Sequence, residues 1–196
     1  MDDDNGLIRF FSEEDFFEGE PIPPELWSDY LEAPFGTCSV CGVPLERTVY
    51  EIQKAFTKRQ RTPSDRKGGE KPRGPSWETV IEMACCLDCG RSLAVEYSQQ
   101  SMEAIRKFLA ERLRLDRPPE LCNLCGEPFA AAPSYSCWAL GRGTSLLFPV
   151  IHVCAFCEEK LESLLSEKTR RAHEEFVNKT FPGVPADLDF SPKILL

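Results

Sequence analysis

Apolar residues recur at helical spacing in two long stretches of the chain. When residues 93–113 are projected at about 100° per residue, apolar side chains fall on one broad arc and most charged side chains lie opposite. The stretch from Cys157 to Phe176 repeats the pattern with a narrower apolar stripe. Pro118-Pro119 ends the first stretch and Pro182-Gly183 ends the second. The pattern predicts two long amphipathic helices, each of which needs a partner for its apolar face.

Short stretches rich in β-branched and aromatic residues precede each predicted helix. Residues 48–52 and 77–84 predict the two strands of a first hairpin. Residues 134–140 and 145–153 predict a second hairpin around the turn at Gly141-Arg-Gly143. Both halves of the chain therefore carry the same order of parts, which indicates an internal repeat.

Four Cys-x-x-Cys pairs occupy matching points of this repeat. In each half the first pair, here called the knuckle, is followed by a glycine that allows a tight turn with positive φ and aims main-chain N–H groups at the sulfurs. The second pair opens the helix, whose positive N-terminal end favours an anionic cluster. The pairs are Cys38/Cys41, Cys86/Cys89, Cys122/Cys125 and Cys154/Cys157.

Two such pairs, brought together by a hairpin, supply the four thiolates of a tetrahedral zinc site. The spacing predicts two structural zinc ions per chain, held by these eight cysteines. Iron on four thiolates remains an alternative on spacing alone. A redox dithiol would need only one reactive pair, and a disulfide framework would require export.

The repeat favours sequential pairing of the cysteines, although crossed pairing of the first pair with the third is the alternative. Cys85 adjoins Cys86 and could replace it as a ligand, but Cys86 gives the repeated spacing. Cys137 is expected to be a small buried hydrophobic residue.

Knuckle, hairpin and a helix bearing the last two ligands is the order of a treble-clef zinc finger, and both halves resemble it. The resemblance implies a small, metal-stabilised α+β fold of two consecutive fingers, residues 35–117 and 118–181, with their helices packed together. The second finger is similar to the amino-terminal zinc-binding domain of the ClpX unfoldase, through Cys122-Asn-Leu-Cys125-Gly126 and the run from Val150 to Glu158. In that family the domain dimerises and docks substrates and adaptors. The gaps between pairs are longer here, at 44 and 28 residues.

The formal charge of −9 is unevenly distributed. Residues 1–34 hold eleven acids and one arginine, interleaved with aromatic residues. We expect Phe16, Phe17, Trp27 and Tyr30 to pack on the fingers, because small modules have bare apolar faces to cover. A docking peptide for a partner, or an autoinhibitory cover over a basic surface, is the alternative for this arm.

Residues 54–74 are basic, with eight cations against two acids, and their glycines and prolines predict a flexible hairpin loop. The loop is either simply solvated or an arm for nucleic acid or an acidic partner. Residues 182–196 are expected to form an extended tail. The cations expected to contact nucleic acid are Lys58, Arg59, Arg61, Arg66 and Lys67.

Neither a nucleophile–base constellation nor a Gly-rich phosphate loop is visible in the sequence, so we expect a protein that is not an enzyme. His152 lies close to Cys154, but a nuclease of the HNH type would need further His or Asn ligands. The sequence shows no secretory signal or membrane-spanning run, which predicts a cytoplasmic protein. It predicts a zinc-stabilised protein-interaction or adaptor module, with homodimer formation left open. The alternative is a regulatory nucleic-acid-binding protein.

Overall fold

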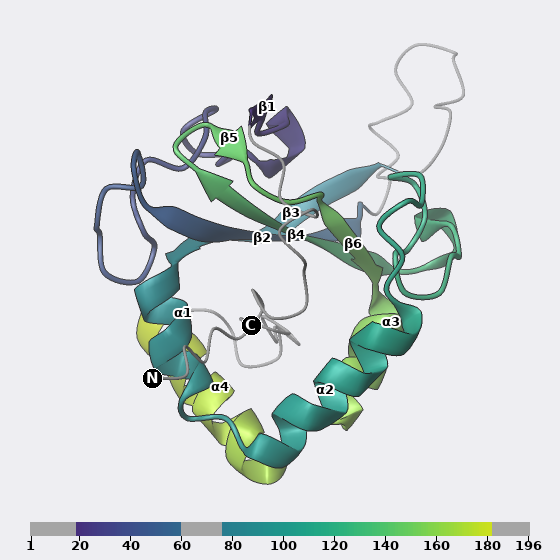
Figure 1. Ribbon diagram of the computed structural model, residues 1–196. Coiled ribbons are helices and arrows are strands. Elements are labelled where there is room, and N and C mark those ends of the chain that lie inside the picture. Colours follow the sequence, from purple (N-terminus) through teal and green to yellow (C-terminus); the bar gives the residue numbers. More distant parts are fainter. Residues whose placement is uncertain (1–18, 60–75, 182–196) are drawn as a thin grey trace, which may run out of the picture.

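The computed structural model describes residues 19–59 and 76–181 (Figure 1). Within them a six-stranded sheet packs against four helices in a mixed α+β fold. The strands are β1 (Glu20–Pro21), β2 (Val49–Lys58), β3 (Trp77–Cys86), β4 (Ser134–Arg142), β5 (Ser145–Leu146) and β6 (Ile151–Cys154). The helices are α1 (Leu87–Ala94), α2 (Gln99–Arg112), α3 (Ala155–Ser163) and α4 (Glu167–Thr180), with short 3₁₀ turns at Pro24–Leu26 and Phe129–Ala131.

The two predicted hairpins are joined into one continuous sheet. Its strand order is β1-β5-β4-β2-β3, and β6 pairs with β4. Strands β2 and β4 pair antiparallel along their length, from Val49 opposite Arg142 to Thr57 opposite Ser134. The halves are therefore united through main-chain hydrogen bonds at the centre of the sheet, in addition to the helix packing that the sequence predicts.

The repeat is visible in the register of this central pair. Cys122 follows Cys38 by 84 positions, and the same shift carries β2 (49–58) onto residues 133–142, which contain β4. Applied to the pair of Tyr50 and Gly141, the shift gives residues 134 and 57, which are also paired. The two halves are thus related by an approximate two-fold axis between β2 and β4.

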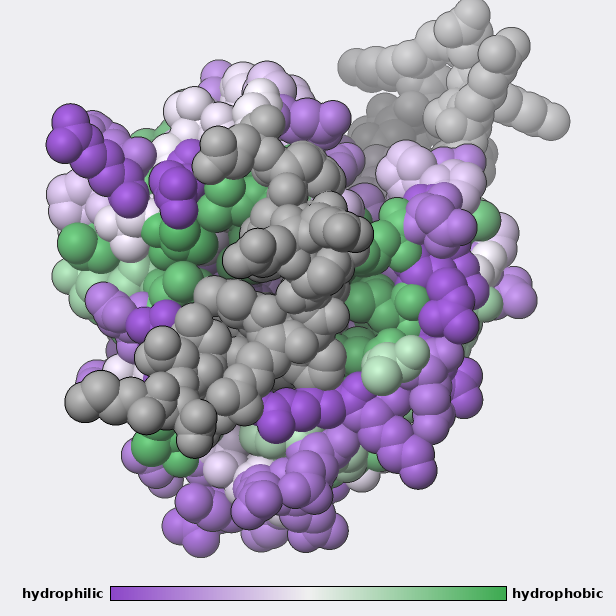
Figure 2. Space-filling view, in the orientation of Figure 1, coloured by the Kyte–Doolittle hydropathy of each residue, from purple (hydrophilic) through white to green (hydrophobic). Residues whose placement is uncertain are grey.

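Each predicted long helix is divided into two. Ser98 and Ser166 end the breaks, and their side chains cap the following helices by accepting hydrogen bonds from the N–H groups of Ser101 and Thr169. The apolar arc was thus predicted correctly, but it belongs to two helices that meet at an angle. On the face in Figure 2, hydrophilic side chains cover the lower, helical part, while hydrophobic side chains gather where the helices meet the sheet.

The second helix of each half crosses to the other half. Ile105 and Leu109 of α2 join the core that surrounds Cys122 and Cys154, whereas Phe176 of α4 packs on the cluster of Met83, Cys85, Leu93 and Tyr97. Figure 1 accordingly shows α1 beside α4 and α2 beside α3. This exchange buries the apolar face of each helix against the opposite half.

Four hydroxyl groups hold the crossing point. The N–H of Ser98 donates to Thr169 Oγ1 at 3.0 Å, and the N–H of Ser166 donates to Ser101 Oγ at 2.8 Å. The Oγ atoms of Ser98 and Ser166 are 2.8 Å apart. These reciprocal bonds satisfy helix N-terminal groups that would otherwise be buried without acceptors.

The N-terminal segment covers the sheet on the side opposite the helices. Ile22 and Leu26 are buried in a core with Tyr50 and Ile52, and Trp27 packs against it. Packing of the arm is therefore seen for these residues, whereas Tyr30 is 91% exposed and contradicts the expectation made for it. Phe16 and Phe17 lie outside the described residues.

The predicted loop at 54–74 begins too early. Strand β2 continues through Lys58, because it lies between β3 and β4 and has hydrogen-bonding partners on both sides. Lys54 is buried, with Nζ 2.6 Å from Asp29 Oδ1, 3.3 Å from Glu82 Oε2 and 2.7 Å from the carbonyl oxygen of Trp27. It therefore serves to anchor the N-terminal segment rather than a loop.

Candidate metal centres

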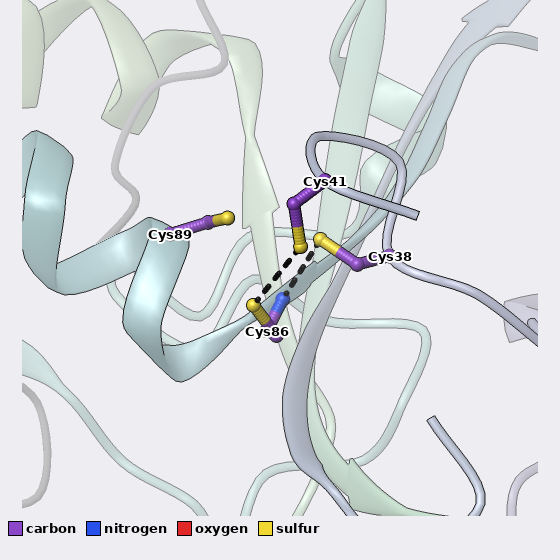
Figure 3. Close-up of side chains that lie close together, drawn as sticks. All are labelled: Cys38, Cys41, Cys86 and Cys89. Atoms are coloured by element: carbon purple, nitrogen blue, oxygen red, sulfur yellow. Dashed lines mark hydrogen bonds between the residues drawn. The ribbon is translucent and has the colours of Figure 1, made fainter. Parts of the chain in front are cut away.

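The first four-cysteine group joins the first knuckle to the junction of β3 and α1. The sulfur atoms of Cys38, Cys41, Cys86 and Cys89 lie within 4.8 Å of one another (Figure 3). Cys86 is the last residue of β3 and the N-cap of α1, and Cys89 lies in the first turn of the helix. Strand and helix thereby present two sulfurs toward the knuckle.

The second group is built in the same way. The sulfur atoms of Cys122, Cys125, Cys154 and Cys157 lie within 4.8 Å of one another, and Cys154 ends β6 and caps α3. The structure thus groups each knuckle with the pair that follows it in the sequence. Cys85 and Cys137 belong to neither group and are buried elsewhere in the core.

The sulfur spacing fits a tetrahedral metal ion. Metal–sulfur bonds of about 2.3 Å require sulfur–sulfur edges of about 3.8 Å in a regular tetrahedron. Cys41 Sγ lies 3.8 Å from Cys86 Sγ, and Cys125 Sγ lies 3.7 Å from Cys154 Sγ. Both groups therefore have the size and donor set for one metal ion each, and four thiolates with tetrahedral geometry favour zinc.

Glycine gives each knuckle its turn. Gly42 has φ of +74° and Gly126 has φ of +80°, both in the left-handed region. Their N–H groups donate to the carbonyl oxygens of Cys38 and Cys122 at 2.9 and 2.8 Å. The local sequence thus encodes the turn that brings the two sulfurs of each knuckle to one side.

Main-chain N–H groups point at one sulfur in each group. The N–H of Cys86 donates to Cys38 Sγ, and that of Cys154 donates to Cys122 Sγ, both at 3.4 Å. Burial raises the pKa of Cys38, but hydrogen bonds from main-chain N–H groups, that of Cys86 foremost, outweigh it and lower the pKa to about 7. The same kind of bond favours a thiolate ligand at this position.

The remaining thiols resist ionisation without a cation. Burial, followed by the neighbouring Cys86 and Cys41 thiols, raises the pKa of Cys89 well above its ordinary value. The crowding of Cys122 and Cys154 likewise raises the pKa of Cys157. Four thiolates at this spacing repel one another, so a dication is the natural means of stabilising them together.

A side-chain acceptor docks each knuckle onto the neighbouring strand. In the first half the N–H of Ser39 donates to the carbonyl of Ala84 at 2.7 Å, and the N–H of Ala84 donates to Ser39 Oγ at 3.0 Å. In the second half Asn123 makes the matching pair with His152, at 2.8 and 2.6 Å. The sequence analysis did not single out Ser39 and Asn123, although both follow the first cysteine of a knuckle and carry a side-chain oxygen.

The other predicted site residues have different roles. His152 is buried, and its Nε2 lies 3.6 Å from Glu25 Oε1, where hydrogen bonding to His152 lowers the pKa of Glu25. Lys58 donates to the carbonyl of Ala130 at 2.8 Å. Arg59 is exposed at the end of β2, while Arg61, Arg66 and Lys67 lie outside the described residues.

No helix among residues 76–181 is both long and apolar enough to cross a membrane. No protein-family model, curated protein sequence or solved structure matches the chain. The resemblance of the second half to the ClpX domain therefore stays a prediction.

Proposed function

We propose that the protein is a non-enzymatic interaction module in which two structural zinc ions hold one sheet and its crossed helices in place. The observation that carries the proposal is the closed ligand set of each site: four cysteines surround each metal position. Catalytic zinc sites keep a position open for water or substrate, whereas structural sites have four protein ligands. A tetrathiolate zinc ion has no redox chemistry of its own, so its contribution is to fold and rigidity.

We further propose that the two halves are treble-clef fingers fused through β2 and β4. The order of knuckle, strands and a helix bearing the last two ligands supports this assignment in each half. Under this proposal the reducing cytoplasm keeps the thiolates available for zinc. Docking of partner proteins, as in the ClpX domain, is the role that the resemblance suggests.

The surface of the first half supports an interaction role. Seven large apolar side chains of the described residues are exposed, and five of them belong to the N-terminal segment, the first knuckle or β3. These five are Tyr30, Leu31, Val40, Val43 and Val80. Exposed apolar side chains that gather on one part of a small protein favour a contact with another macromolecule.

Elemental analysis of the purified protein tests the metal assignment. We expect two zinc ions per chain, and we expect a strong chelator to unfold the protein because structural zinc binding and folding are coupled. Cys86→Ser should lower the zinc content to one ion, whereas Cys85→Ser is the matched control and should retain two. Two iron atoms per chain, or full folding after zinc removal, would contradict the proposal.

A pull-down from native extract tests the interaction role. The zinc-loaded chain should retain a protein partner, and Cys86→Ser should lose any partner that binds through the first half. Failure of the intact, zinc-loaded chain to retain any protein above the level of unrelated zinc-finger bait would contradict the role.

A further inference from the structure

Strand β3 forms an open edge of the sheet. Among the described strands it pairs with β2 alone. On its outer side Ser39 occupies the N–H and carbonyl of Ala84. Main-chain groups alternate between the two sides of an antiparallel strand, so Glu82 also directs its N–H and carbonyl outward. Within the described part of the chain, no further main-chain bond reaches this side between Trp77 and Met83.

Apolar side chains line this open edge. Val80 is the extra residue of a bulge opposite Ala55 and Phe56, and it is 40% exposed. The turn that carries Tyr30 and Leu31 is tied to the same strand, because Ser28 Oγ donates to Glu82 Oε1 at 2.8 Å and the N–H of Asp29 donates to Glu82 Oε2 at 2.7 Å. The knuckle with Val40 and Val43 docks at Ala84.

The same edge is acidic. Asp29, Glu32 and Glu78 are exposed there. Lys54 is buried beneath Asp29 and Glu82 and is engaged by both, so it presents no charge to an incoming chain. The first metal site adds negative charge, since four thiolates and one dication sum to −2. The electrostatic field along β3 therefore favours a positively charged ligand.

The charges disfavour a second copy of this chain as the occupant. Antiparallel pairing of two β3 strands around Val80 would place Glu78 of each copy opposite Glu82 of the other. Like charges directly opposite one another destabilise a sheet, and a bulge interrupts regular pairing between edges. The edge thus discourages self-association while remaining complementary to a basic strand.

We propose that the outer edge of β3, from Trp77 to Glu82, accepts an extended segment of a partner protein in which basic and apolar residues alternate. The inference rests on the proposed interaction function and specifies its surface. Main-chain hydrogen bonds to the edge supply affinity, as in other strand-addition complexes. Tyr30, Leu31 and Val80 contact the apolar side chains, while Asp29 and Glu78 pair with the basic ones.

A defined peptide tests this surface directly. The probe is a fluorescein-labelled, end-blocked Lys-Val-Arg-Val-Lys-Val peptide, and the counter-probe replaces every basic residue with glutamate. Fluorescence anisotropy with the zinc-loaded full chain should show binding of the basic peptide that weakens with salt, at least about tenfold tighter than that of the acidic peptide. Amide shifts in a ¹⁵N-labelled protein should move most for residues of β3.

Two charge reversals provide the matched comparison. Glu78→Lys should weaken binding of the basic peptide by about fivefold, since one attraction becomes a repulsion. Glu159→Lys makes the same charge change at an exposed position on α3 and should leave affinity unchanged. Equal affinity of both variants, equal binding of both peptides, or shifts confined to other elements would overturn the proposal.

The outcome for the native partner separates this inference from the proposed function. If Glu78→Lys retains from extract the same partner as the intact chain, binding occurs elsewhere and only the β3 surface is wrong. If neither chain retains a partner, the interaction function itself is wrong. A dimer of the intact chain in analytical ultracentrifugation that Glu78→Lys alters would identify a second copy as the occupant and overturn the inference.

Discussion

Glu51 places a carboxyl group in the interior of the central sheet, and we expect this group to make stability depend on pH. It lies on β2, opposite Cys85 of β3 and Leu140 of β4, and its side chain is 5% exposed. Burial raises the pKa of Glu51 well above its usual range. The charge that Glu51 would carry also contributes to the raised pKa values of Tyr97 and Cys85. Replacement by glutamine keeps the shape and removes the ionisation.

The sign follows from proton linkage. The unfolded chain ionises Glu51 near its ordinary pKa of about 4.3, while the folded protein keeps it protonated to higher pH. Folding stability is therefore fully present below the unfolded pKa and is lost as pH rises toward the folded pKa. The loss approaches about 1.4 kcal/mol per pH unit, or about 2.7 kcal/mol between roughly pH 5.5 and pH 7.5 if the folded pKa lies above that interval.

Urea unfolding of the zinc-loaded protein at several pH values measures the effect. The stability of Glu51→Gln relative to the parent chain should increase steadily with pH from about 5.5 upward. Glu46→Gln is the control, because Glu46 is exposed and its replacement should give a difference that does not change with pH. A difference between Glu51→Gln and the parent that is the same at every pH would refute the reasoning.

Three further substitutions test the metal sites, the helix crossing and the buried cation. Cys157→Ser should unfold the second half and release one zinc ion, as read by circular dichroism and metal analysis, whereas Cys137→Ser should retain both ions. Ser101→Ala leaves the N–H of Ser166 without its acceptor and should cost about 1–2 kcal/mol in urea unfolding, while the exposed Ser163→Ala should change little. Lys54→Met removes the cation between two carboxylates and the N-terminal segment, and it should make that segment more accessible to protease; unchanged digestion would contradict its anchoring role.

Local sequence determined the parts of this protein that depend on spacing along the chain. The Cys-x-x-Cys pairs, with glycine after Cys41 and Cys125, specify two turns that each present two sulfurs. The second pairs coincide with the junctions of strand and helix, as the change from β-type to helical patterning predicts. A repeat analysis would also have found Ser98 and Ser166, because each lies twelve residues after Cys86 or Cys154.

Only the tertiary structure decided how the two halves combine. Nothing local to β2 indicates that it pairs with β4 as well as β3, since that contact joins residues more than 75 positions apart. The same pairing extends β2 through Lys58 and buries Lys54, which by composition belongs with the basic residues that follow. The apolar stripes of α2 and α4 predicted that partners exist, but not that each lies on the opposite half. Burial depends on which surfaces meet in space, and spacing along one segment carries no information about that choice.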